Sequence, residues 1–189
     1  IGLNRAIVCQ GLKILKLKKN LGLKTLLDIC DIKNKPDVYH IGYLLGPRIN
    51  AGGRVGKSSH GANLLTNKDP KDVYKIASEL DNFNKERQYL EKDVLEKILV
   101  QLGNKIHEPV IIVEGKNWHE GVIGIVASRI KDKFNKPVII ISVNKDGVGK
   151  ASARSIVGFD IGSVIISATQ EKILIKGGGH KMAGGFSIK

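Results

Sequence analysis

The sequence is poor in the residues that define several common classes of protein. Only 5% of its 189 residues are aromatic, and two are cysteines. Cys9 and Cys30 lie in separate apolar contexts without CxxC spacing, which predicts reduced structural thiols and argues against a zinc site. No apolar run approaches transmembrane length, and no stretch resembles a signal peptide. These absences predict a cytoplasmic protein that makes no use of a membrane.

Carboxylates are also scarce relative to basic groups. There are 18 Asp and Glu against 31 Lys and Arg, and the resulting net charge of +13 predicts a polyanionic partner. Because 25 of the basic residues are lysines, a biased genome explains the charge equally well. Residues 121–189 are themselves basic, with eleven Lys and Arg against four Asp and Glu. No DxD, HxH or HExxH pattern occurs, so no metal site is predicted within this chain.

The first half of the sequence predicts helices. Apolar residues recur at helical spacing in two pieces between residues 5 and 32. Asp69 is suited to cap a helix that Pro70 begins and that ends near Leu102. The apolar positions of this long helix are close to a heptad repeat. We interpret it as a connector between two lobes, with a coiled-coil dimer as the alternative.

The second half predicts a mixed α/β domain. Continuous apolar runs at 109–115 and 136–143 predict buried strands, and the amphipathic stretch 120–134 predicts a helix between them. This order predicts a βαβ unit with a parallel pair of strands. Residues 150–156 are expected to be extended, a short helix is expected within 160–169, and a closing strand is expected at the C-terminal end.

Two stretches place polar residues where an anion could bind. "GPRINAGGR" (46–54) carries Arg48, Asn50 and Arg54 among glycines, and we interpret it as an anion-binding loop, with a turn that exposes its arginines as the alternative. His119 stands in the turn before the helix at 120–134. It is either a phosphate ligand near free N–H groups or a simple cap or surface residue.

Two further stretches lie in the basic C-terminal part. If "KASARSI" is extended, Lys150, Ser152 and Arg154 share one face and form a phosphate grip; an edge strand with polar outward residues is the alternative. "IKGGGHKMAGGFSIK" (175–189) has five glycines in nine positions around His180. A flexible linker would not carry a histidine and continue into an apolar strand, so a ligand is expected to approach this backbone closely.

These motifs, in this order, resemble the RecJ-type exonucleases of the DHH phosphoesterase superfamily. "GPRINAGGR", "NWHEGVIGIVASR", "KASARS" and "GGGHKMAGGF" carry the resemblance, and "LNRAIVCQGLKIL" resembles the end of that family's metal-binding lobe. The similarity covers essentially the whole chain. It implies that residues 1–68 end the catalytic DHH lobe, that 69–106 form the connector helix, and that 107–189 form the substrate-binding DHHA1 domain.

The resemblance also implies an activity for the full-length protein. RecJ-type enzymes degrade single-stranded DNA from its 5′ end in repair and recombination, with two divalent metal ions, Mn²⁺ or Mg²⁺, held by Asp and His of the DHH lobe. By similarity, Arg48 and Asn50 line the cleft near the metals, with Arg54 beside them. Ser152 and Arg154 hold the terminal phosphate. His180 is the expected catalytic residue, and it meets the scissile phosphate or its neighbour together with Gly178 and Gly179.

The resemblance leaves alternatives and has departures. A DHHA1 pattern also occurs in phosphodiesterases of short oligonucleotides or cyclic dinucleotides, and a non-catalytic nucleic-acid-binding module is a third interpretation. Gly52 and Gly184 stand where the family often has alanine, which is expected to loosen the loops. The DHH motif and upstream aspartates do not occur in this sequence, and an oligonucleotide-binding domain is expected after residue 189. Expected partners of the full protein are single-stranded DNA and either a single-strand-binding protein or a helicase. By itself this chain is expected to bind DNA weakly and cut nothing.

Overall fold

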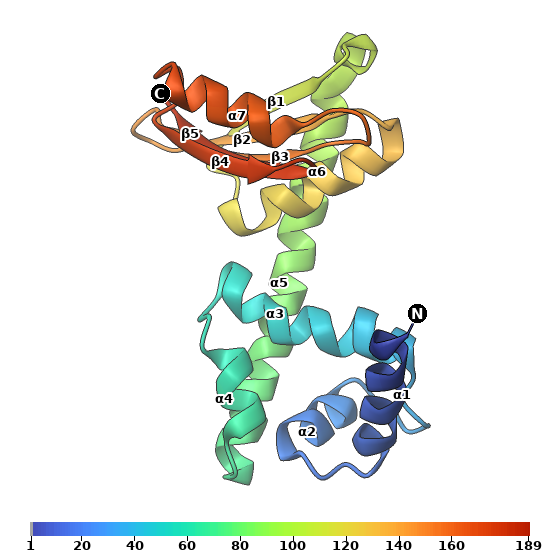
Figure 1. Ribbon diagram of the computed structural model, residues 1–189. Coiled ribbons are helices and arrows are strands. Elements are labelled where there is room, and N and C mark those ends of the chain that lie inside the picture. Colours follow the sequence, from blue (N-terminus) through green and yellow to red (C-terminus); the bar gives the residue numbers. More distant parts are fainter. Residues whose placement is uncertain (1) are drawn as a thin grey trace. The chain divides into compact units, whose positions relative to one another are not determined.

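The computed structural model describes residues 2–189, apart from the side chains of residues 104 and 105 (Figure 1). The chain divides into two compact units, residues up to 88 and residues 89–189, and the boundary falls inside helix α5. This helix, Pro70–Leu102, runs without a break for 33 residues, as predicted. Asp69 begins it, because its carboxylate accepts hydrogen bonds from the N–H groups of Lys71 and Asp72.

The first unit is helical. It contains α1 (Leu3–Lys16), α2 (Leu21–Ile29), the π-helix η1 (His40–Leu45), α3 (Gly46–Val55), α4 (His60–Thr66) and the first part of α5. Asn20 separates α1 from α2 and caps α2 by accepting from Leu23 N–H. The two helices predicted between residues 5 and 32 are therefore confirmed. The buried core of the unit combines one residue of α1 with residues of α2, η1, α4 and α5 and with Ile32: Leu15, Leu26, Leu27, Ile32, Leu45, Leu64, Val73, Ala77 and Leu80.

Helix α1 is the exception to this burial. Of its apolar residues only Leu15 is buried, whereas Ile7 and Val8 are 59% and 43% exposed. Cys9 is also exposed, so the prediction of a structural thiol is wrong for it. Cys30 is half-buried, and burial raises the pKa of its thiol.

The apolar seam of α5 is buried within the chain itself. Val73, Ala77 and Leu80 are fully buried in the first unit, and Ile98 and Leu102 are fully buried in the second. These side chains are not available to a second copy of the helix. The coiled-coil interpretation of the seam is therefore wrong.

The second unit is built on a five-stranded sheet. Its strands are β1 (Ile111–Lys116), β2 (Val138–Val143), β3 (Gly149–Arg154), β4 (Lys176–His180) and β5 (Ala183–Ile188), in the order β1-β2-β3-β5-β4. The first two are parallel and are joined by α6 (Glu120–Phe134), which confirms the βαβ unit. The other pairs are antiparallel. Helix α7 (Ile161–Gln170) precedes β4 and confirms the short helix expected there.

The two helices cover opposite faces of the sheet (Figure 1). Gly124 of α6 lies against Ser152 of β3, whereas Ile161 and Ile165 of α7 pack with Ala153, the next residue of the same strand. Successive side chains of a strand point to opposite faces. Helix α6 packs on β2 and β3, and α7 packs on β4 and β5 from the other side. On the α6 face, β5 and β4 are therefore not covered by α6.

Two local interpretations differ from the structure, and one strand was not predicted. "GPRINAGGR" is helix α3 and not a loop, because Pro47 suits a first turn and the glycines allow close packing. The glycine cluster forms β4 and the start of β5, joined by a tight turn. Residues 150–154 lie in β3, between β2 and β5, so the edge-strand alternative is wrong.

Gly52 and Gly184 also lie in these regular elements. An ideal Cβ on Gly52 would be 2.7 Å from the carbonyl oxygen of Lys57, and one on Gly184 would be 2.5 Å from Cδ1 of Ile165. The expectation that they loosen loops is therefore wrong, because both give room for packing. Among residues 2–189, no helix combines the length and the apolar character needed to cross a membrane.

Candidate nucleic-acid interface

Arg154, at the end of β3, is held in one orientation by oxygen atoms. Its Nε donates to Oγ of Ser128 at 3.1 Å, and its Nη1 donates to Oγ of Ser152 at 3.1 Å and to the carbonyl oxygen of Ala153 at 2.8 Å. Ser128, on α6, donates its own hydroxyl proton to Gly124 O, which fixes the lone pair that Arg154 uses. These three acceptors are neutral oxygen atoms, and together they fix the orientation of the guanidinium.

Gly124 makes this arrangement possible. An ideal Cβ at this position would lie 2.9 Å from Oγ of Ser152 and 3.0 Å from Nη2 of Arg154. Such contacts are closer than normal van der Waals separations, so α6 can approach β3 only with a glycine here. Gly124 and Ser128 are functional candidates that sequence reasoning missed. Their spacing of one helical turn on the face toward the predicted phosphate grip was the available signal.

His180, at the end of β4, has its ring anchored by the main chain. Its Nδ1 accepts a hydrogen bond from Met182 N–H at 3.3 Å. In the neutral imidazole the proton therefore resides on Nε2, which can donate to an oxygen atom of a ligand. The side chain is exposed.

The strand register places most of the predicted residues of this unit on one face. Arg154 and His180 are both opposite Ala183 of β5, one from each side, so their Cα atoms are roughly 10 Å apart at two strand spacings. Ser152 and Gly178 are both opposite Gly185 in the next row of the same face. The structure therefore brings Ser152, Arg154, Gly178 and His180 together.

The five glycines of the cluster divide between the two faces. On the α7 face, an ideal Cβ on Gly177 would be 2.7 Å from Ile165, and one on Gly179 would be 2.6 Å from the carbonyl oxygen of Ala183. Gly184 lies on this face as well. Only Gly178 and Gly185 lie on the α6 face, and a Cβ on Gly178 would meet nothing within 4 Å. Close packing of the hairpin thus accounts for most of the cluster, and Gly179 does not share the face of His180.

His119 caps α6. Its Nδ1 accepts from Gly121 N–H at 3.1 Å, and its exposed ring leaves Nε2 toward solvent. The preceding Trp118 fixes this turn, because it is buried against Gly115 and its carbonyl oxygen accepts from Ser142 Oγ at 2.6 Å. The cap interpretation of His119 is confirmed, and its role as a phosphate ligand stays a prediction.

The remaining predicted residues lie on α3 in the first unit. Arg48 donates from Nε to Asp81 Oδ1 at 2.8 Å and from Nη1 to Leu44 O at 2.9 Å. The side chains of Arg48 and Asp81 are only 16% and 11% exposed. Lys85 binds the other carboxylate oxygen at 2.7 Å. Burial opposes the charge on Asp81, but the hydrogen bonds from Lys85 and Arg48 outweigh it, so the pKa of Asp81 lies below its usual value.

Asn50 and Arg54 lie one helical turn apart on α3, which places them on one side of the helix. Asn50 is exposed, and Arg54 is half-buried. Asp81, which holds Arg48, was missed from the sequence because it is 33 residues away along the chain.

The described residues offer no metal centre. No group of three or more His, Cys, Asp or Glu side chains within them could hold a metal ion. Carboxylates and imidazoles in such groups are what divalent ions require.

The second unit is a small mixed sheet that carries Ser152, Arg154 and His180 on one face. The DHHA1 domain family matches residues 48–189, and the chain belongs to this family.

The curated relatives of the whole chain share one name. The chain is 34% identical over 190 residues to the "Single-stranded-DNA-specific exonuclease RecJ" of Bacillus subtilis, a match that covers 98% of this chain and 24% of that protein. It is 33% identical over 196 residues to the RecJ of Escherichia coli, covering 98% of this chain and 34% of that one. The chain thus spans about a quarter to a third of the length of these relatives.

Solved structures agree with this similarity. RecJ from Thermus thermophilus in complex with Mn²⁺ superposes with a TM-score of 0.86 at 31% identity, covering 100% of this chain and 27% of that one. An exonuclease RecJ bound to manganese gives a TM-score of 0.83 at 30% identity, and the match covers 98% of this chain and 46% of that one. The resemblance to RecJ-type exonucleases, and the fold expected from it, are confirmed.

Proposed function

We propose that this chain is the substrate-binding part of a single-stranded-DNA-specific exonuclease that degrades its substrate in the 5′→3′ direction. The observation that carries the proposal is the row formed by Arg154, Ala183 and His180 on the open face of the sheet. A small residue between two hydrogen-bond donors leaves space for a phosphate between them. The names of the relatives support single-stranded DNA as the substrate.

Within this proposal each residue has a role. Arg154, with Ser152 beside it, holds the terminal 5′ phosphate through charge-assisted hydrogen bonds. His180 donates from Nε2 to an oxygen of the scissile phosphate, where negative charge grows as the bond breaks. Gly178 and Gly179 supply main-chain groups of the same strand, with the side-chain-free position of Gly178 open toward the ligand. On α3, Arg48, Asn50 and Arg54 contribute to the substrate cleft, Arg48 from its bond to Asp81.

The remainder of the catalytic machinery is assigned to the longer protein. We propose that residues 1–68 form the end of a DHH lobe, that residues 69–106 form the connector helix, and that residues 107–189 form the substrate-binding DHHA1 domain. Two divalent ions, Mn²⁺ or Mg²⁺, would be ligated by residues outside this chain and would supply the activated water. The exposed apolar residues of α1 suit a helix that packs against such a lobe. The process is DNA repair and recombination in the cytoplasm, with a single-strand-binding protein or a helicase as partner.

The full-length protein tests this proposal. With Mn²⁺ it is expected to release mononucleotides from 5′-phosphorylated single strands, and the isolated chain is expected to bind the same strands without cutting them. A preference for di- to pentanucleotides over long strands would instead favour an oligonucleotide phosphodiesterase. Salt-sensitive binding without turnover would favour the third interpretation, a non-catalytic nucleic-acid-binding module.

The histidine provides a sharper test in the full-length protein. His180→Ala is expected to lower turnover by about a hundredfold and affinity far less, because its hydrogen bond strengthens in the transition state. Single-turnover kinetics combined with equilibrium binding separate the two effects. A loss confined to affinity would make His180 a positioning contact and would contradict its catalytic role.

A further inference from the structure

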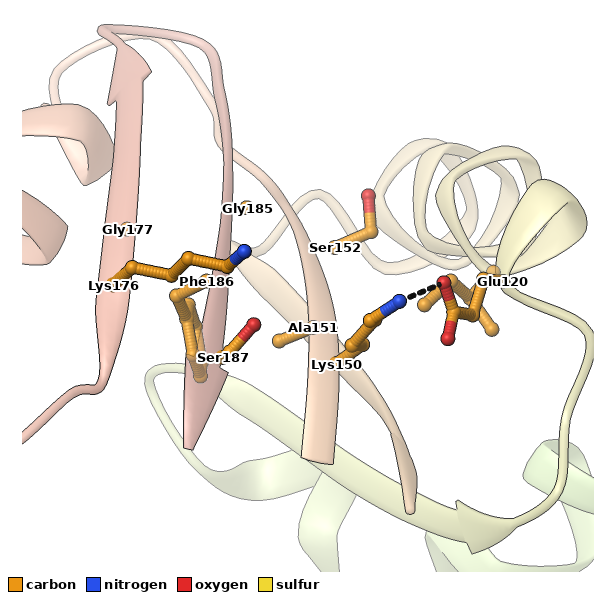
Figure 2. Close-up of a pocket in the computed structure, with 10 residues that line it drawn as sticks. Glu120, Lys150, Ala151, Ser152, Lys176, Gly177, Gly185, Phe186 and Ser187 are labelled. Carbon is orange, nitrogen blue, oxygen red and sulfur yellow. Dashed lines mark hydrogen bonds and ion pairs between the residues drawn. The ribbon is translucent and has the colours of Figure 1, made fainter. Parts of the chain in front are cut away.

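A groove of about 540 Å³ lies on the α6 face of the sheet, next to the first turn of α6 (Figure 2). One wall is Glu120 and Ile123 of α6, and the floor is formed by β3, β5 and β4. Polar contributions come from two lysines and two serines on the strands: Lys150, Ser152, Lys176 and Ser187. Lys150, which the sequence places in one phosphate grip with Ser152 and Arg154, and Lys176 both lie outside the row formed by Arg154, Ala183 and His180.

The register of the strands aligns these side chains in parallel rows. Lys150 and Lys176 are both opposite Ser187, from its two sides. This row repeats the pattern of Arg154, Ala183 and His180, in which a small residue separates two donors. Because Lys150 and Arg154 are four residues apart on one strand, the two rows are separated by about 13 Å. Both rows lie on the same face.

The space between the rows is flat. The middle row consists of Ser152, Gly185 and Gly178, so two of its three positions have no side chain. An ideal Cβ on Gly178 would meet nothing within 4 Å. The sugar–phosphate backbone of a short strand therefore has room above the floor between the two rows.

The two lysines of the second row are exposed, whereas Ser187 between them is largely buried. Figure 2 shows the ammonium group of Lys176 reaching across the hairpin toward Gly185, and this side chain has no hydrogen bond or ion pair within residues 2–189. Lys150 is paired with Glu120 at 2.8 Å, but the two side chains are 54% and 53% exposed. Exposed pairs of this kind contribute little, so an incoming anion can compete with Glu120.

We propose that Lys150, Ser187 and Lys176 form a second phosphate subsite for single-stranded nucleic acid, which rests on the proposed function of the first row. The strand runs from its 5′ phosphate at Arg154 toward Lys150, and an internal phosphate occupies the second row. Two ammonium groups and a hydroxyl are donors that suit a phosphate. A stacked base is less suited, because the only aromatic side chain of the groove, Phe186, packs with the α7 core.

The test measures the affinity of this 189-residue chain for 5′-phosphorylated oligothymidylates of one to five nucleotides by calorimetry. In the wild type, affinity is expected to rise at the length where an internal phosphate reaches the lysine row. The double variant Lys150→Gln, Lys176→Gln is expected to lose that rise, by about tenfold, while its affinity for 5′-thymidylate is unchanged. The slope of the logarithm of its binding constant against the logarithm of the salt concentration is expected to become shallower by roughly 0.7 for each lost phosphate contact.

Two further variants sharpen the result. Lys145→Gln removes an exposed lysine of the β2–β3 turn and measures the effect of losing one positive charge outside the groove. Glu120→Gln releases Lys150 and is expected to strengthen binding of the longer oligomers severalfold. Thermal unfolding of each variant confirms that it is folded.

The possible results separate the two proposals. If wild type binds the longer oligomers and the double variant matches Lys145→Gln, the second subsite is overturned and the proposed function stands. If the double variant loses affinity for 5′-thymidylate by the same factor as for the longer oligomers, the second subsite is likewise overturned. If the wild type binds no 5′-phosphorylated thymidylate of any length, the proposed function fails, and this inference fails with it.

Discussion

Two arginines, one in each unit, come from stretches that the sequence predicts to bind an anion. The structure holds them differently. Arg48 is bonded to the carboxylate of Asp81, which Lys85 also contacts. Arg154 is oriented by Ser128, Ser152 and a main-chain carbonyl oxygen. The carboxylate balances the charge of Arg48 and ties α3 to α5 within the first unit. The bonds of Arg154 to three neutral oxygen atoms instead fix the orientation of its guanidinium on the α6 face of the sheet.

The largest effect is expected from Asp81→Asn. This change leaves Arg48 largely buried without its carboxylate and is expected to lower the free energy of unfolding by about 3 kcal/mol. Affinity of the folded variant for 5′-thymidylate is expected to stay at the wild-type value. Urea unfolding and calorimetry measure the two quantities. A variant as stable as the wild type would show that the pair does not secure α3.

The pH dependence of the same variant gives an independent check. The pKa of Asp81 is lowered from its ordinary value of 3.8, so its contribution to stability is fully present above that pH. The contribution is lost as the pH falls through the lowered pKa. The difference in stability between wild type and Asp81→Asn is therefore expected to shrink in that acidic window. A difference independent of pH would exclude ionised Asp81 as its source.

A smaller effect on stability, but a direct one on binding, is expected from Arg154→Gln. Loss of a charge-assisted contact to a terminal phosphate is expected to lower the preference for 5′-phosphorylated over 5′-hydroxyl strands by about tenfold. The ratio of the two affinities is the measurement, and it cancels any general loss of charge. Lys133→Gln, at the far end of α6, is the control. An unchanged ratio would refute the role of Arg154.

The smallest and most specific effect is expected from Gly124→Ala. Alanine is the better helix former by about 0.8 kcal/mol, but its Cβ would press on Ser152 and Arg154. We therefore expect a several-fold weaker preference for a 5′ phosphate with little change in unfolding free energy. Gly11→Ala in α1, where a Cβ meets nothing within 4 Å, is the matched control and is expected to affect stability alone. Equal binding by both variants would contradict the positioning role of Gly124.

Periodicity and caps predicted much of the fold. Helix α6 occupies the predicted residues, because His119 caps its start and Asn135 adopts the left-handed conformation at its end. The parallel pair followed from two apolar runs around that helix. Strand β4 was not predicted, because glycine has a low preference for strands; here the close approach of α7 outweighs that preference. Helix α3 was interpreted as a loop because glycine also has a low preference for helices.

The candidate site was predicted only in its local parts. Alternation along one strand was enough to place Ser152 and Arg154 on a shared face. The alignment of His180 with Arg154 depends on the order of β3, β5 and β4, which no local pattern encodes. The bond between Arg48 and Asp81 likewise depends on how α3 packs on α5. Partners distant in sequence are set by packing and register, and a single sequence does not contain that information in readable form.

The open position at Gly178 has a practical consequence for spectroscopy. Both native cysteines, Cys9 and Cys30, belong to the first unit. With these replaced by serine, Gly178→Cys would introduce one thiol on the open face, at a place where the backbone tolerates a side chain. A small fluorophore attached there would sense the arrival of a polyanion directly, whereas the same label at Gly177 or Gly179 would displace its packed neighbours.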